Sequence, residues 1–183
     1  MKTQETSKEA EFIKRIERLD AGELAQLRRG CGERDPVEGR CPWLISYIHG
    51  VAKETVAFLV ASLLAQYRTV DIKAGSHRSD GNFGLTWRRA IAGNDSDSIK
   101  RRFHILLDAD YDPWTGDGDL PYRLRQMVRY AANRGVGVDW PVLLTDLKFW
   151  NHSEKRVQKR WAHSFFSNER PEDTTAPQEE KEK

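Results

Sequence analysis

The chain has 183 residues, 38% of them hydrophobic and 32% charged, with 30 Lys and Arg against 28 Asp and Glu. A chain of this length can bury a hydrophobic core without disulfide or metal support, and its six Trp, seven Phe and five Tyr exclude a wholly disordered protein. The near balance of charge excludes a histone-like polycation, but it is uneven along the chain: residues 87–170 hold 15 basic and 11 acidic side chains, and residues 171–183 hold 2 and 5.

Helix signals cover the N-terminal half of the chain. Capping residues, apolar side chains at helical spacing and glycine stops predict helices there, with Ser7 and Asp20 as the first two caps. The expected helices span residues 8–19, 21–29, 43–50 (as a short helix or helical turn) and 53–67. A loop rich in Gly, Pro and charge fills 30–42. The helix over 53–67 is apolar nearly all round, which predicts that it is central and buried.

The same signals return after a polar stretch over 68–82, which contains Gly75 and Gly81 and is expected to form a flexible loop. The expected helices run from Asn82 or Phe83 to Ala92, from a cap at Asp95 or Ser96 to the acidic loop over 109–118, from Asp119 to Gly135, from Asp139 to Trp150, and from Ser153 to about Phe166. Pro121 and Pro141 stand in the first turns of their helices, where proline is favoured.

No segment alternates apolar and polar residues with the period of a strand, so the predicted fold class is all-α, with about eight helices in one or two packed bundles. We divide the chain into an N-terminal helical part over 1–67, the flexible loop over 68–82, and a C-terminal helical bundle with basic faces over 83–166. Residues 167–183 are rich in Glu, Lys, Pro and Thr, which predicts a disordered acidic tail.

Motifs for catalysis are missing from the sequence. It has no Gly-rich phosphate loop, no paired-histidine zinc motif and no nucleophile elbow, so we predict no catalytic residue, no cofactor and no metal site.

Cys31 and Cys41 match no zinc spacing and are too few for a disulfide scaffold, so we expect free thiols, buried or partly exposed. The most apolar run, over 56–65, is too short to span a bilayer; with the charged N-terminus, this favours a cytoplasmic protein without a membrane partner.

The acidic loop over 108–119 has carboxylates at the first, third, fifth and twelfth positions of a helix–loop–helix calcium site. The sixth position, however, is Pro113 where the sharp turn of such a site needs Gly, and Asp119 is shorter than the usual bidentate Glu. Calcium binding is therefore the minor alternative to a solvated connector, with Asp119 serving as the cap of the next helix.

Basic side chains of the C-terminal half gather on helix faces. On the last helix the apolar side chains fall on one side. The opposite side carries Lys155, Arg156, Lys159, Arg160 and His163. In the helix over 119–135, Arg125 and Arg129 stand one turn apart, close in sequence to Arg123, and no acidic residue occurs between residues 120 and 138. Further basic clusters are Arg28–Arg29, Arg88–Arg89 and Lys100–Arg102.

Charge runs of this kind are usually solvated helix faces. Two observations favour nucleic-acid binding instead: the runs lack the Glu one turn earlier that a self-paired face carries, and they are rich in Arg, whose planar guanidinium suits phosphate oxygens. Several such faces on one side would follow a nucleic-acid backbone without reading its sequence. The alternative is a helical protein–protein adaptor whose basic faces bind acidic proteins. For Trp114 and Tyr122, base stacking and a place in the core both stay open.

Five segments form an ordered set that points to one family. They are LAQLRRG at 24–30, SIKRRFHILLDA at 98–109, LPYRLRQMVR at 120–129, VDWPVLLTDL at 138–147 with Trp150, and RWAHSFF at 160–166. The set resembles the CasB family, the small subunit of Cascade, which is the type I-E CRISPR surveillance complex. The similarity runs from about Phe12 to Phe166, and it rests on the ordered set because most of these residues are core or capping positions.

The resemblance implies an all-α subunit, not a nuclease, that is present as a pair in the complex and lies along its guide-binding subunits. It implies a role in holding open the region of the guide RNA–target DNA hybrid, chiefly through the displaced DNA strand, while base pairing supplies specificity. The basic residues that fit this role are Arg28, Arg29, Arg101, Arg102, Arg123, Arg125, Arg129, Lys155, Arg156, Lys159 and Arg160. The acidic, Gly-rich loop over 111–118 and the tail over 167–183 depart from the family pattern.

Overall fold

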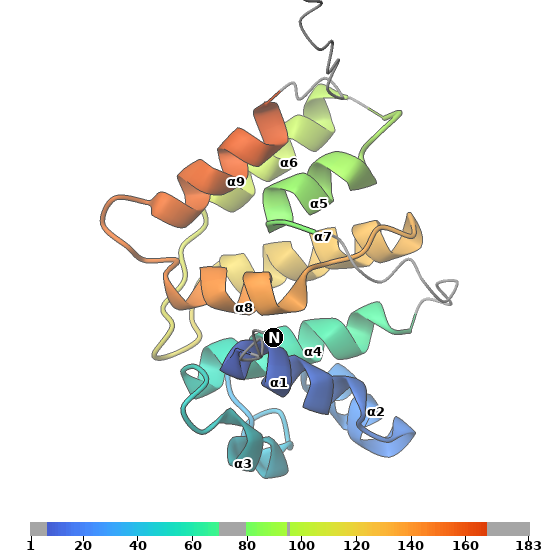
Figure 1. Ribbon diagram of the computed structural model, residues 1–183, viewed down its shortest axis with the longest axis vertical. Helices are drawn as coiled ribbons and strands as arrows, with labels where there is room; N and C mark the ends of the chain where they lie inside the picture. The colour runs from blue at the N-terminus through green and yellow to red at the C-terminus, as the bar shows by residue number, and fades with distance from the viewer. Residues whose placement is uncertain (1–6, 70–79, 95, 168–183) are drawn as a thin grey trace, which may run out of the picture.

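The computed structural model describes residues 7–69, 80–94 and 96–167. Within these segments the chain forms nine α-helices, one short 3₁₀ helix and no strand, which confirms the predicted all-α fold (Figure 1). The elements are α1 Lys8–Glu17, α2 Ala21–Gly30, η1 Pro42–Leu44, α3 Ile45–Ile48, α4 Glu54–Tyr67, α5 Phe83–Ala90, α6 Asp97–Leu107, α7 Leu120–Asn133, α8 Trp140–Lys148 and α9 Arg156–Phe166. Most of the predicted flexible loop (70–79) and of the predicted tail (168–183) lies outside the described residues.

Several predicted helix starts carry side-chain caps. Ser7, Asn82 and Asp139 each accept a hydrogen bond from a backbone N–H in the first turn of their helix. At α2 the cap is reciprocal, because Asp20 accepts from the Glu23 N–H (2.8 Å) and the Glu23 carboxylate accepts from the Asp20 N–H (3.1 Å). These caps satisfy backbone donors that a helix start leaves without partners, so they fix where the helices begin.

Asp119 occupies its predicted N-cap position without a capping hydrogen bond, and the predicted cap Ser153 is wrong. Asp119 precedes α7, but its carboxylate accepts a hydrogen bond from the Arg123 guanidinium (2.7 Å) and no side chain caps the helix. Ser153 does not begin the last helix, which starts after Lys155, a residue in the left-handed conformation (φ 49°). The Lys155 N–H donates to the His152 carbonyl (2.7 Å), so the chain makes a tight turn there before α9 can begin.

Other boundaries differ slightly from the prediction. Ser96 occupies the N-cap position of α6 without accepting a side-chain hydrogen bond, and Asp95 lies outside the described residues. The helices α5 and α8 end before the predicted Ala92 and Trp150, because the chain tightens into a turn after the last helical residue of each.

The helix α4 is the centre of the molecule. Every residue of α4 is buried except Glu54 and Gln66, which confirms the prediction from its apolar circumference. It packs against α1, α2, α3, α7 and α8, and Figure 1 shows it between the α1–α3 group and the layer of α7 and α8. A helix without a polar face exposes apolar surface to water unless neighbours surround it, so the position of α4 follows from its sequence.

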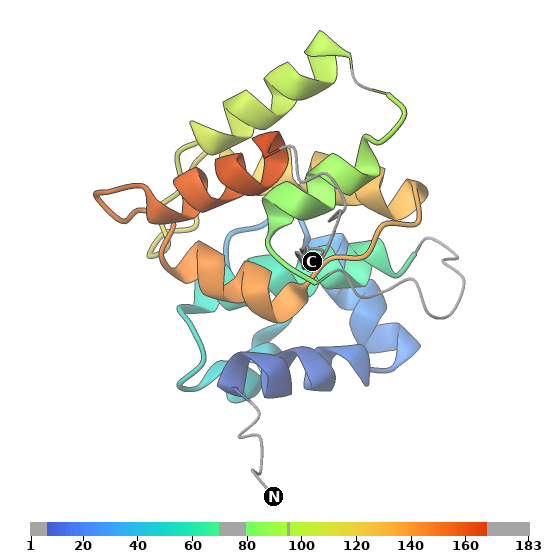
Figure 2. The same ribbon diagram turned by 45° about the horizontal axis from the view of Figure 1, so that its top comes forward.

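The helices α5, α6 and α9 form a further tier beyond α7 and α8, visible in both Figure 1 and Figure 2. In this tier α9 packs against α5 and α6, and both α5 and α6 contact α7. Buried apolar side chains from all tiers join one hydrophobic core, which runs from Phe12 in α1 to Phe165 in α9. The division of the chain into parts over 1–67 and 83–166 stays a prediction.

The helices α5 and α9 approach closely at Gly84. A β-carbon there would lie 2.1 Å from the Trp161 carbonyl oxygen, so the α9 backbone would have to shift. We expect Gly84→Ala to lower the free energy of unfolding by about 1–3 kcal/mol, because this strain exceeds the gain in helix propensity from alanine. Urea unfolding followed by circular dichroism measures the change. In the matched control Gly32→Ala, the new β-carbon meets Arg125 at an ordinary 3.6 Å, and equal losses in both variants would contradict the close α5–α9 approach.

Candidate nucleic-acid interface

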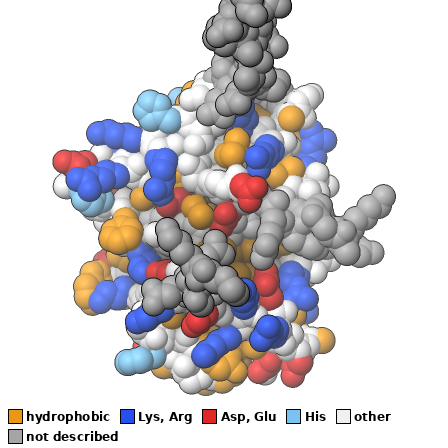
Figure 3. All heavy atoms as spheres, viewed as in Figure 1, with side chains coloured by type: hydrophobic (Ala, Val, Ile, Leu, Met, Phe, Trp, Pro, Cys, Tyr) orange, Lys and Arg blue, Asp and Glu red, His pale blue; other side chains and the backbone are white. Residues whose placement is uncertain are grey.

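The helix α9 presents its basic side chains to solvent. The exposed side consists of Lys155, Arg156, Lys159, Arg160 and His163. The buried side consists of Val157, Gln158, Trp161 and Phe165. The structure therefore confirms the division of this helix into a basic face and a core face, and the space-filling view shows Lys and Arg gathered over α9 (Figure 3).

A buried carboxylate fixes α9 to α8. Asp146 is 1% exposed, and its two oxygens accept hydrogen bonds from the Trp161 indole (2.6 Å) and from the Arg160 guanidinium. The Gln158 amide adds a second tie by donating to the Trp150 carbonyl (2.7 Å). Because a buried carboxylate is tolerated only when paired and hydrogen-bonded, this arrangement holds the basic face of α9 in one orientation.

Sequence analysis missed Asp146 as a positioning residue. The signal available in the sequence was a single acid within the largely apolar segment over 140–147. An isolated acid of that kind is usually placed on the solvent side of a helix, and only the packing of α9 on α8 shows that it is buried.

Three of the predicted contact residues are engaged with acidic side chains. These ion pairs are Arg123–Asp119, Arg156–Glu154 and Arg160–Asp146. The others have no acidic partner within 4.0 Å in the part of the chain that the structure describes: Arg28, Arg29, Arg101, Arg102, Arg125, Arg129, Lys155 and Lys159. The Arg156–Glu154 pair is largely exposed, so it contributes little stability.

The structure brings Arg125 of α7 to the C-terminal end of α2. The Arg125 Nη1 lies 3.6 Å from the position that a β-carbon would take at Gly32. Burial raises the pKa of the neighbouring Cys31 thiol, and a hydrogen bond from Ser62 and the Arg125 charge partly offset this rise. The predicted pair Arg28–Arg29 stands in the last turn of α2, next to this contact.

The predicted basic residues do not form one continuous surface. The helices α2 and α9 lie near opposite ends of the longest axis of the molecule, so the α2 arginines are remote from the basic face of α9 (Figure 1). Arg101 and Arg102 are exposed on α6, which packs against α7 and α9, so they lie in the same tier as the α9 face. Arg129 is exposed on α7, whereas Arg123 is half-buried beside Asp119.

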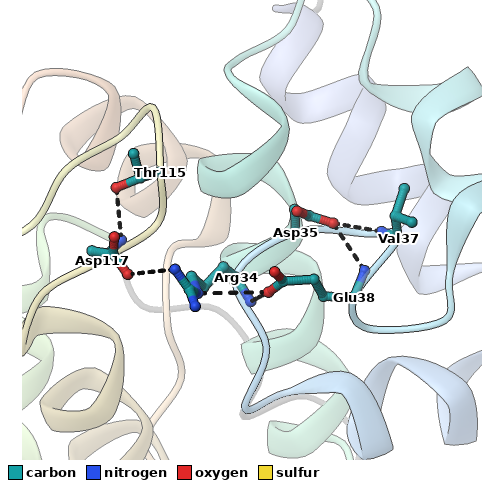
Figure 4. Close-up of polar contacts among 6 residues, drawn as sticks. All are labelled: Arg34, Asp35, Val37, Glu38, Thr115 and Asp117. Carbon is teal, nitrogen blue, oxygen red and sulfur yellow. Dashed lines mark hydrogen bonds and ion pairs between the residues drawn. The ribbon is translucent and has the colours of Figure 1, made fainter.

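The acidic loop over 109–118 is tied to the loop that follows α2. The Arg34 guanidinium donates to the Asp117 carboxylate (3.0 Å) and lies 3.6 Å from the Glu38 carboxylate (Figure 4). The Asp112 carboxylate accepts from a backbone N–H within its own turn (2.8 Å). Among the residues that the structure describes, no three His, Cys, Asp or Glu side chains are grouped so that they could hold a metal ion. The loop carboxylates named here serve turns and an ion pair.

Other sequence predictions concern single residues. Cys31 and Cys41 are free thiols and both are buried, as the sequence predicted. Trp114 and Tyr122 are 70% and 61% exposed, so neither lies in the core. None of the described helices combines the length and the hydrophobicity that a membrane span requires.

The fold and its surface define a helical protein whose outer helices carry arginine- and lysine-rich faces. Residues 23–166 match the family model of the CRISPR-associated protein Cse2. The chain belongs to this family, whose solved members carry the names Cse2 and CasB, in agreement with the resemblance seen in the sequence.

Individual relatives agree with this assignment. The chain is 35% identical over 111 residues to the CRISPR-associated protein Cse2 of Thermus thermophilus, an alignment that covers 60% of this chain and 54% of that protein, so the chain spans about half the length of this curated relative. It is 29% identical to M. ruber CasB, whose crystal structure superposes with a TM-score of 0.71 over 88% of this chain and 94% of that chain. A chain of a CRISPR RNA-guided surveillance complex shares the fold, with a TM-score of 0.68 at 23% identity over 86% of this chain and 91% of that chain.

The buried Asp146 gives a test of how α9 is held. We expect Asp146→Ala to lower the free energy of unfolding by about 2–3 kcal/mol, because it leaves the Trp161 indole N–H buried without an acceptor and Arg160 without its counter-ion. Urea unfolding at neutral pH measures the loss. The matched control is Glu154→Ala, which removes the exposed partner of Arg156 and should change stability by no more than about 0.5 kcal/mol. A loss at Asp146 as small as that of the control would contradict the anchoring role.

Proposed function

We propose that the protein is a non-catalytic small subunit of the type I-E CRISPR RNA-guided surveillance complex, Cascade, in antiviral defence. In this role it binds nucleic-acid backbone without sequence specificity and stabilises the R-loop of guide RNA and target DNA, chiefly through the displaced DNA strand. Membership of the Cse2 family supports the assignment, and so does the shared fold with a chain of a surveillance complex.

The observation that carries the proposal is the basic face of α9. Lys155 and Lys159 are exposed and, within the described residues, have no acidic partner. Lys159 lies on α9 and Lys155 directly before it, and α9 is held against α8 by the buried Asp146. Cations that are exposed, unpaired and fixed in position attract phosphates and release the counterions bound to them, which favours binding to any sequence.

The proposal includes partners and a place of action. The subunit would contact other Cascade subunits, a second copy of itself, the guide RNA–target DNA hybrid and the displaced strand, in the cytoplasm. Base pairing between guide and target supplies the sequence specificity, so the subunit needs no helix that reads base edges. It also needs no catalytic residue, because its contribution is to hold a strand in place.

A helical adaptor that binds acidic proteins is the alternative, because exposed cations attract any polyanion. The two functions differ in what the α9 face recognises. A nucleic-acid surface loses affinity steeply with added salt, with a slope that reports the number of phosphates contacted. An adaptor would leave the full chain without affinity for DNA even at low salt.

Charge reversal tests the α9 face. We expect Lys155→Glu with Lys159→Glu to lower the affinity of the full chain for single-stranded DNA about tenfold or more at low salt. The slope of log affinity against log salt should become shallower by about one to two, because one to two phosphate contacts are lost. Fluorescence anisotropy over a range of salt concentrations measures both quantities, and circular dichroism shows whether the variant remains folded.

The matched control reverses two exposed lysines of α1, Lys8→Glu with Lys14→Glu, which makes the same change in net charge. It should leave the salt slope unchanged, because α1 lies away from the α9 face (Figure 1). Equal effects of both variants would show that only net charge matters and would contradict a local surface. Absence of DNA binding by the unmodified chain at low salt would favour the adaptor.

A further inference from the structure

Two hollows adjoin at Phe149, just beyond the C-terminal end of α8. The first, of about 470 Å³, is lined by residues 50–53 and by Pro113, Trp114, Lys148 and Phe149. The second, of about 390 Å³, is lined among others by Phe149, His152, Arg156 and Arg160. We call the two together the aromatic groove. It leads from the acidic loop to the basic face of α9.

Trp114 stands at one end of the aromatic groove on a firmly held turn. The Thr55 hydroxyl donates to the Pro113 carbonyl (2.5 Å), and the Asp112 carboxylate accepts from the Trp114 N–H (2.8 Å). The Lys53 ammonium lies over the indole, 3.0 Å from the ring centroid. The side chain is nevertheless 70% exposed, so much of the indole remains accessible to a flat ring that stacks on it.

Phe149 is the second exposed ring of the aromatic groove. It is 55% exposed, although its backbone is fixed. Its N–H donates to the Asp146 carbonyl (3.1 Å), and the next residue, Trp150, is buried with its indole donating to the Ala109 carbonyl (3.0 Å). The ring is therefore exposed to solvent on a segment whose backbone is held by hydrogen bonds.

The rim of the aromatic groove is basic. Lys53 lies at one end, and Arg156 and Arg160 lie at the other. Three nearby acids are engaged in ion pairs, which are Glu154–Arg156, Asp146–Arg160 and Glu9–Lys148, whereas Asp112 beside Trp114 accepts a backbone hydrogen bond. Figure 3 shows large hydrophobic side chains among Lys and Arg along the left edge of the molecule, below the α9 face. Exposed rings between cations favour a polyanion that also carries flat apolar groups.

We propose that the aromatic groove binds a single nucleic-acid strand, with bases stacked on Trp114 and Phe149 and phosphates on the cations of the rim. The inference rests on the proposed function and adds to it a site, the aromatic groove, and two residues whose rings would contact the bases of an unpaired strand. Bases within a duplex are covered on both faces by their neighbours, so only unpaired bases can stack on exposed rings. Every base has such a face, so the groove needs no sequence preference.

Ring removal tests the inference on the full chain. Trp114→Ala and Phe149→Ala are each expected to lower the affinity for a labelled oligo-dT strand at least about fivefold at low salt, the equivalent of ~1 kcal/mol per stacked base. Affinity for a duplex and for an abasic strand of the same length should change less than about twofold, because neither offers an unpaired base. Trp114→Phe, which keeps a ring, should retain most of the affinity for oligo-dT. Anisotropy measures all three ligands.

The matched control is Val37→Ala, which removes an apolar side chain that is 63% exposed in the loop after α2 and should change none of the three affinities.

Equal losses of affinity for oligo-dT and for the abasic strand in the ring variants would overturn the stacking inference and leave the proposed function intact. If both ring variants bind oligo-dT as the unmodified chain does, while the Lys155/Lys159 variant loses affinity for it, the stacking inference is overturned and the proposed function is left intact. Ring variants that bind oligo-dT normally but fail to join the other complex subunits would identify the groove as a protein contact and overturn the inference. Failure of the unmodified chain to bind any of the ligands would overturn the proposed function itself.

Discussion

The burial of α4 is the constraint on which the rest of the molecule depends. Only Glu54 and Gln66 of this helix lie outside the core. Other helices must therefore cover α4 on all sides, because a missing neighbour would expose apolar surface to water. Helices from both ends of the chain provide the cover, α1 to α3 on one side and α7 and α8 on the other. Each covering helix is therefore apolar on one face, and its charged side chains lie mostly on the outer surface, with Asp146 of α8 as a buried exception.

Outward charge becomes an organised surface only when the rotation of each helix is fixed. Buried polar ties do this for α9: Asp146 of α8 accepts from Trp161, and the Asn82 amide, just before α5, donates to the Ser164 hydroxyl (2.8 Å). Apolar packing of Trp161 and Phe165 decides which side of α9 faces the core, and the hydrogen bonds add a directional restraint to this packing. Hydrogen bonds are directional, and a buried one that is broken leaves a group without a partner. The orientation of the basic face thus depends on polar groups beneath it as well as on apolar packing.

How much of the structure the sequence could predict depends on whether a feature is set by local or by tertiary interactions. Ser7 and Asp20 cap their helices through hydrogen bonds within one turn, so a few neighbouring residues suffice to place these starts. Ser153 is also a good capping residue, yet the turn that precedes α9 prevents it from capping. On the basic face, helical periodicity alone identifies Lys159. Phe149 could not be found in this way, because its exposure depends on how α8 and α9 meet the acidic loop, which is distant from them in sequence.

A net charge of +2 is small for a protein proposed to bind polyanions, and the placement of its acids explains the discrepancy. Asp20 and Asp139 cap helices, Asp146 is buried under α9, and Glu9 is paired with Lys148, whose hydrogen bond lowers the pKa of Glu9. Several acids are thus used to hold the fold together, while cations such as those of the α9 face lie at the surface. A low net charge gives weak long-range attraction, so the isolated chain would bind modestly and lose affinity with salt. Within an assembly that brings a strand to this surface, the high effective concentration makes a modest affinity sufficient, and a subunit of low net charge then avoids binding unrelated nucleic acid.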